Sequence, residues 1–217
     1  MLDPSQLDTV AAAFVTLGGF HRAAPDETAL AAFWELLEDW PLPDTAAAAR
    51  GLAEMRAARD KPETAEAIRR DHDLLYGDSA TAKVPPYESV HRGIEGLLFD
   101  EHTLQVRDAY RTLSLRAPRL NREPDDHIGL EFDFVARAAI AALDAIDQAQ
   151  PARAERAADA GVMFLRDHLL RWAPGMLDRV VAVAQTHFMR GLALLSLGAL
   201  QSHARLAGLT EPSDVTW

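Results

Sequence analysis

Cysteine is absent from this sequence of 217 residues. Its absence excludes disulfide-stabilised scaffolds, cysteine-ligated zinc, iron–sulfur clusters and thiol catalysis. The fingerprints of several enzyme classes are missing as well, since the chain contains no G-x-S-x-G, no H-E-x-x-H and neither glycine-rich phosphate-binding motif. The sequence therefore gives no support for a nucleotide site or for nucleophilic catalysis.

Basic residues are scarce relative to acidic ones. The 22 Lys and Arg side chains face 33 Asp and Glu side chains, which gives a net charge of −11. A surface of this sign repels phosphate backbones and anionic lipid, so nucleic acid is not an expected partner. It attracts a cationic partner instead, such as a peptide rich in arginine or lysine.

Long hydrophobic runs are missing too. The longest apolar stretch, residues 188–200, contains Arg190 and is too short to span a bilayer. The first residues, MLDPSQ, lack the basic region that opens a signal peptide. We therefore expect a protein of the cytoplasm without stable membrane insertion.

The pattern that is present is helical. Alanine is abundant, and apolar residues recur every three or four positions, as in the stripe from Ile128 through Phe132 and Val135 to Ile146. Prolines punctuate these stretches, and we expect Asp44 and Thr103 to be N-caps. The prediction is one all-α domain over residues 1–217, a bundle of about ten helices, with residues 116–124 as the candidate hinge. The predicted helices span 4–18, 26–39, 45–59, 62–76, 87–97, 103–115, 125–149, 152–171, 175–185 and 187–207.

Two carboxylate–histidine pairs have the spacing of metal ligands. Glu88 and His91 are three residues apart, and His127 and Glu131 are four apart, so each pair shares one helix face. A ferritin-like di-iron site needs two E-x-x-H motifs, and the chain has one. A carboxylate–histidine metalloprotein that uses these four residues stays open as a minor alternative.

An acidic cluster, Glu123-Pro124-Asp125-Asp126-His127, begins the helix expected at 125–149. The simplest interpretation is a capped helix start, because acidic side chains suit the positive end of a helix. The functional alternative is a recognition patch in which Glu123 and Asp126 accept bidentate hydrogen bonds from a peptide arginine.

Two further clusters combine aromatic and polar side chains. Leu75-Tyr76 and Pro86-Tyr87-Glu88-Ser89 lie on either side of a polar loop, and tyrosines beside prolines make a surface that suits peptide docking. His168 and Trp172 are one turn apart near a helix end. In both clusters, packing of these rings in the core is the alternative interpretation.

The order of these clusters resembles the TorD/DmsD family of redox-enzyme maturation chaperones, from about residue 70 to 207. The matching segments are Leu75-Tyr76-Gly77, Pro85-Pro86-Tyr87-Glu88-Ser89-Val90, Glu123-Pro124-Asp125-Asp126-His127-Ile128 with Glu131, His168-Leu169-Leu170-Arg171-Trp172, and Phe188-Met189-Arg190-Gly191-Leu192-Ala193.

The resemblance implies a cytoplasmic, all-α, TorD-like chaperone without catalytic activity. Such proteins bind the twin-arginine signal peptide, or the folded body, of a molybdenum-containing oxidoreductase, and delay export until the molybdopterin cofactor is inserted. The partner is then a molybdoenzyme precursor, and the chaperone is either a monomer or a homodimer. The peptide-binding residues implied by motif position are Leu75, Tyr76, Pro86, Tyr87, Glu88, Ser89, Glu123, Pro124, Asp126, His127, Glu131, His168 and Trp172.

A second alternative is a nitrate-reductase-type assembly chaperone, which binds the body of its apoenzyme without export. The sequence does not separate it from the signal-peptide binder.

Overall fold

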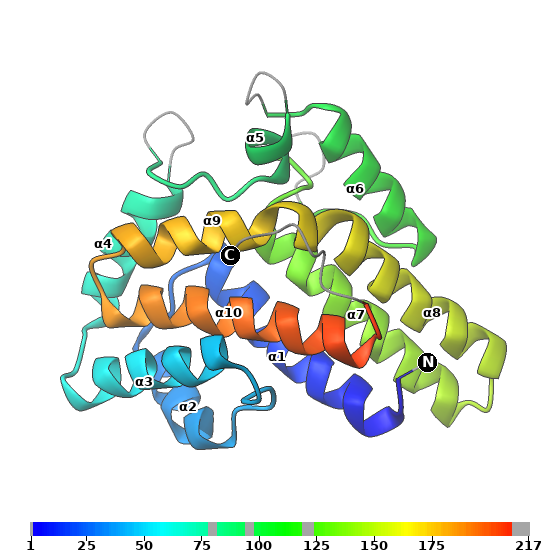
Figure 1. Cartoon of the computed structure of the whole chain (residues 1–217), viewed down its shortest axis with the longest axis horizontal. Coiled ribbons are helices and arrows are strands. Elements are labelled where there is room, and N and C mark those ends of the chain that lie inside the picture. The colour runs from blue at the N-terminus through cyan, green and yellow to red at the C-terminus, as the bar shows by residue number, and fades with distance from the viewer. Residues whose placement is uncertain (1, 78–81, 94–97, 119–123, 210–217) are drawn as a thin grey trace.

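The computed structural model describes residues 2–77, 82–93, 98–118 and 124–209. Within these ranges the chain is all-α, as predicted (Figure 1). The helices are α1 (Pro4–Arg22), α2 (Glu27–Leu36), the 3₁₀ turn η1 (Leu37–Asp39), α3 (Ala46–Asp60), α4 (Ala65–Tyr76), α5 (Glu88–Arg92), α6 (Glu101–Thr112), α7 (Ile128–Asp147), α8 (Pro151–Phe164), the π-helical turn η2 (Leu165–Leu169), α9 (Leu170–Val183) and α10 (His187–Leu206).

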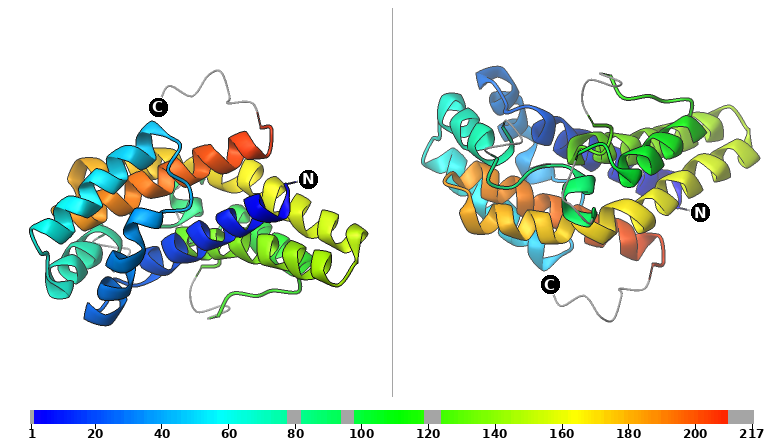
Figure 2. Two further views of the ribbon diagram at one scale, coloured as in Figure 1. Left: turned by 90° about the horizontal axis from the view of Figure 1, so that it is seen from below. Right: turned by 90° about the horizontal axis from the view of Figure 1, so that it is seen from above.

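Two helix pairs form the centre of the molecule. The helix α1 packs along α7, and α3 packs along α10, which lie side by side in Figures 1 and 2. Close approach depends on glycine: a Cβ atom on Gly18 would lie 2.9 Å from the carbonyl oxygen of Gly129, and one on Gly51 would lie 2.8 Å from the backbone nitrogen of Leu195. The rings of Phe14 and Phe132 stack between α1 and α7, with centroids 4.9 Å apart.

The helix starts follow local capping chemistry. Asp3 and Gln6 form a capping box, and Thr45 and Asp100 cap α3 and α6 through side-chain oxygens. The predictions of Asp44 and Thr103 as N-caps were therefore wrong.

Several helix boundaries also differ from the prediction. The helix expected at 87–97 is the short α5, which ends at Arg92, and its last predicted residues lie outside the described part. Pro174 does not separate two helices. The chain continues from α8 through η2 and α9 to Val183, with Pro174 inside α9. The helix tolerates the lost hydrogen bond because Trp172, Met176 and Leu177 are buried on both sides of the proline.

Of the candidate hinge at 116–124, residues 119–123 lie outside the described part. No helix among the described residues is both long enough and apolar enough to cross a bilayer.

Candidate functional site

Two segments from the predicted site meet as a short antiparallel pair. Glu88 N–H donates to the Asp126 carbonyl oxygen at 3.0 Å, and Ile128 N–H donates to the Pro86 carbonyl oxygen at 2.8 Å. These bonds place Tyr87 opposite His127 as an isolated β-bridge. The backbone therefore joins the tyrosine–proline cluster to the acidic cluster, although about 40 residues separate them in the sequence.

A pocket of about 540 Å³ lies beside this bridge. Its walls come from the end of α1, from α4, from the bridge and from the chain that precedes α7. The lining residues are Gly19, Arg22, Ala23, His72, Tyr76, Tyr87, Ala117, Pro118, Pro124, His127 and Leu130. We call this hollow the bridge pocket. Four of the predicted peptide-binding residues line it, namely Tyr76, Tyr87, Pro124 and His127.

His127 is held as a neutral ring. It is the N-cap of α7, and its Nδ1 accepts the N–H of Gly129 at 3.0 Å. Burial lowers the pKa of His127 to about 3, and the positive charges of His72 and Arg22 act in the same direction. The Tyr87 ring meets it edge to face, with centroids 5.3 Å apart. The pocket thus presents an uncharged imidazole at neutral pH.

A buried chain of hydrogen bonds holds the Tyr76 side chain in place. Its hydroxyl lies 3.1 Å from His21 Nδ1, and His21 Nε2 lies 2.8 Å from the Ser196 hydroxyl. Burial raises the pKa of Tyr76 and lowers the pKa of His21, so both rings are neutral at pH 7. His72 contacts the same region through the carbonyl oxygen of His21. Each ring on this wall of the pocket therefore has a hydrogen-bond partner.

Asp126 does not face the pocket, which corrects the prediction that it binds a peptide arginine. Its side chain is fully buried. One carboxylate oxygen accepts Ser89 N–H at 2.7 Å, and the other accepts the Thr103 hydroxyl at 2.9 Å. Burial raises the pKa of Asp126, while these hydrogen bonds act in the opposite direction. Asp126 therefore positions the bridge and the start of α5, and both of its oxygens are occupied.

The charge in the bridge pocket is also opposite to the expectation. Arg22 lines the pocket, and among the described lining residues none is Asp or Glu. Glu123, the second predicted arginine ligand, lies outside the described residues. The described walls therefore suit an apolar segment better than an arginine side chain.

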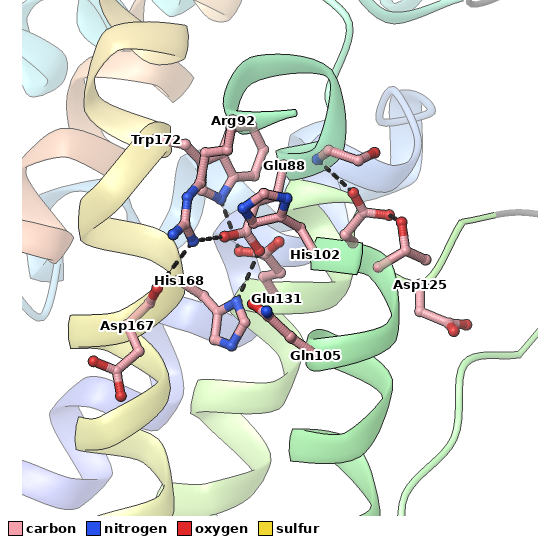
Figure 3. Close-up of polar contacts among 12 residues, drawn as sticks. Glu88, Arg92, His102, Gln105, Asp125, Glu131, Asp167, His168 and Trp172 are labelled. Atoms are coloured by element: carbon pink, nitrogen blue, oxygen red, sulfur yellow. Dashed lines mark hydrogen bonds and ion pairs between the residues drawn. The ribbon is translucent and has the colours of Figure 1, made fainter. Parts of the chain in front are cut away.

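Glu88 belongs to a buried ionic cluster behind the bridge (Figure 3). Its carboxylate is fully buried, lies 2.8 Å from His168 Nδ1 through one oxygen and pairs with Arg92 through the other. Arg92 also donates to the carbonyl oxygen of Asp167 at 3.0 Å. Since a buried carboxylate needs such partners, Glu88 ties α5 to the turn η2.

Glu131 and Trp172 form the adjacent part of the cluster. The Trp172 indole N–H donates to Glu131 Oε2 at 3.1 Å, and Oε1 has no partner among the described residues. Burial raises the pKa of Glu131 well above its usual range, and the negative charges of Glu88 and Asp126 raise it further. Burial and these neighbouring charges therefore favour the protonated form of the Glu131 carboxyl group.

The remaining predicted residues within the described part do not line the bridge pocket. Leu75, Pro86 and Ser89 are buried, as are Glu88, Glu131, His168 and Trp172. Sequence reasoning missed the partners of the buried carboxylates, Arg92 and Thr103, and the pocket residues Arg22 and His72. Only Arg92 had a visible signal, since it lies four residues after Glu88.

The metal-site alternative finds no cluster to support it. The described residues contain no group of three or more His, Asp or Glu side chains that could hold a metal ion. His91 stacks on Trp172 and contacts the Pro85 carbonyl oxygen, whereas His127 lies in the bridge pocket. The four proposed ligands therefore form no common group that could hold a metal ion.

Comparison with known proteins identifies the family. A family model described as "Nitrate reductase delta subunit" matches residues 41–178, which is more than half of the chain. A protein named "Probable Tat proofreading chaperone DmsD" from Haemophilus influenzae is 29% identical over 134 residues, or 62% of this chain. The chain belongs to the TorD/DmsD family. "Chaperone protein TorD" from Vibrio cholerae is 27% identical over 143 residues, or 66% of this chain.

The matches to these TorD/DmsD relatives are partial, since they span 59% of the Haemophilus protein and 63% of the Vibrio protein. The resemblance read from the clusters is confirmed at the level of the family.

Proposed function

We propose that this chain is a cytoplasmic chaperone for a molybdenum-containing oxidoreductase. In this proposal it binds the twin-arginine signal peptide of the enzyme precursor, its client, and delays export until the cofactor has been inserted. It acts by binding and catalyses no reaction. Membership of the TorD/DmsD family supports the chaperone role, and the relatives it resembles carry the names of chaperones.

The proposed binding site is supported by one observation. The motif segments that contain Tyr87 and His127 meet at the bridge pocket. Tyr76, Tyr87, Pro118, Pro124 and Leu130 give it apolar walls with polar tips. Such walls bury the apolar part of a signal peptide, at about 1.5–3 kcal/mol for each well-buried side chain. Three or four anchors, less the cost of ordering the peptide, correspond to roughly micromolar affinity. A chaperone that must release its client needs affinity of this order.

In this proposal the two arginines of the signal peptide do not bind inside the bridge pocket. Arg22 on the pocket wall disfavours a second guanidinium there. The net charge of −11 attracts the cationic end of the peptide from a distance and raises the association rate. The pair then lies outside the bridge pocket.

The test is a binding titration with the leader peptides of the molybdenum-containing oxidoreductases encoded in the same genome. Tyr87→Ala is expected to weaken binding at least tenfold, because it removes an apolar wall of the pocket. Leu36→Ala is the control, since Leu36 is exposed on α2 far from the site in sequence. Equal affinity for both variants would place the peptide elsewhere, and binding of no leader at all would refute the function.

A second candidate is a nitrate-reductase-type chaperone that binds the apoenzyme body. The description of the matching family model favours it. A client lacking its N-terminal segment separates the two candidates. Retention of this truncated client on the immobilised chaperone would favour body binding, and its loss would favour the signal-peptide binder.

A further inference from the structure

A second hollow lies between α6, α7 and α8, and it shares no lining residue with the bridge pocket. We call it the α8 groove. Its volume is about 750 Å³. Leu113, Phe134, Met163 and Phe164 line it together with alanines from all three helices. Small residues on three adjacent helices leave room for a fourth element to approach, and Met163 adapts readily to different partners.

His168 presents a hydrogen-bonding atom at one end of the α8 groove. The side chain lies on the π-helical turn η2, a local distortion that often marks functional sites. His168 Nδ1 lies 2.8 Å from a Glu88 carboxylate oxygen, so the ring nitrogen outside this contact is Nε2. It has no partner among the described residues, and the ring points into the space between α6 and α8 (Figure 3).

Arginine side chains stand at the other end of the α8 groove. Arg153 and Arg156 line it from the first turns of α8, and both are exposed. Arg153 donates to the Gln150 side chain, and Arg156 forms no ion pair within the described part of the chain. Along the helix, Arg153 and His168 are separated by roughly 22 Å at 1.5 Å per residue. Two carboxylates also line the groove: Asp159 lies between its ends, and Asp167, which pairs with Arg166, lies beside His168. The groove thus has two arginines at one end and a carboxylate at the other.

We propose that the α8 groove binds an amphipathic helix of about four turns from the client, with its amino end at His168 and its carboxyl end at the arginines. The first N–H groups of a helix have no intrahelical partner, so they can donate to the Asp167 carboxylate, which lines the groove beside His168. The last carbonyl groups carry the negative end of the helix dipole, which complements Arg153 and Arg156. The apolar face then covers Leu113, Phe134 and Met163. This proposal builds on the proposed function, which supplies the client.

The experiment uses the full chain and a synthetic probe, a leucine–alanine helix of about 14 residues. One form carries Glu in its last turn and the other carries Lys, and fluorescence anisotropy reports binding. We expect the Glu form to bind about fivefold more tightly, an effect of the size given by exposed charge pairs. Arg156→Glu should abolish or reverse this preference. Met163→Glu should weaken both forms at least tenfold.

Ile140→Glu is the matched control, because Ile140 is exposed on α7 and does not line the groove. Equal binding by the Met163 and Ile140 variants, or no binding of the probe, would overturn the proposal. So would a homodimer of the wild type that Met163→Glu dissociates, since the occupant would then be a second copy. Tyr87→Ala should leave probe binding intact, so failure of the α8 groove and failure of the bridge pocket are distinguishable.

Discussion

The central helices pack through apolar side chains such as Phe14 and Phe132, whereas the segments that contain Glu88 and Asp126 are held by these buried carboxylates. A helix satisfies its own backbone hydrogen bonds, but an irregular segment does not. Asp126 supplies the missing acceptor for Ser89, and Glu88 ties α5 to η2. The bridge pocket lies at the edge of this second region. The comparison teaches that helix packing supplies stability here, while carboxylates set the geometry of the site.

The largest effect is expected in the apolar region. Phe132→Ala removes a fully buried ring and should lower the free energy of unfolding by about 3–5 kcal/mol. Urea denaturation measures the change. Phe99→Ala is the control, since that ring is half exposed and its loss should change stability by roughly 0.5 kcal/mol or less. Similar losses in both variants would contradict the placement of the core.

A smaller loss of stability is expected when Asp126, whose carboxylate orders the bridge, is replaced. Asp126→Ala leaves Ser89 N–H without an acceptor and should cost about 2–3 kcal/mol in unfolding free energy. Asp126→Asn should cost less than about 1 kcal/mol, because its carbonyl can accept from Ser89 and its amide can donate to the Thr103 hydroxyl. Hydrogen exchange at Ser89 and Ile128 reads out the bridge directly. Equal protection in the two variants would show that Asp126 does not order it.

The smallest expected effect is on the way in which the stability of the folded state depends on pH. The pKa of Glu131 is raised in the folded state by burial and by the charges of Glu88 and Asp126. The folded state therefore holds this proton more tightly than the unfolded state does, so the contribution of Glu131 to stability is lost as pH rises above its unfolded pKa near 4.3. Glu131→Gln has no such proton and keeps an acceptor for Trp172.

The stability of Glu131→Gln relative to wild type should therefore rise between about pH 4 and pH 8. Thermal denaturation of both proteins across this range provides the measurement. A constant or falling difference would show that Glu131 is ionised in the folded protein.

The helices and their order could be predicted because apolar periodicity and proline are local signals. The unbroken helix at Pro174 could not, since buried Trp172 and Leu177 hold it together through tertiary packing. Motif order grouped Tyr87 with His127, and the two residues pair in the antiparallel bridge. Their role in peptide binding stays a prediction. Motif order predicted that Asp126 binds a peptide arginine, and this prediction was wrong. Nothing in the sequence shows that the Thr103 hydroxyl on α6 donates to the second carboxylate oxygen of Asp126. Burial of a charged side chain is decided by such distant partners.

Photo-crosslinking tests the central claim most directly. A benzophenone amino acid placed at Tyr87, on the wall of the bridge pocket, should crosslink to the apolar segment of the bound twin-arginine leader. The same group at Met163, in the α8 groove, should not crosslink to that leader. Crosslinking from Met163 and none from Tyr87 would contradict the account, because the signal peptide would then occupy the groove and leave the bridge pocket empty.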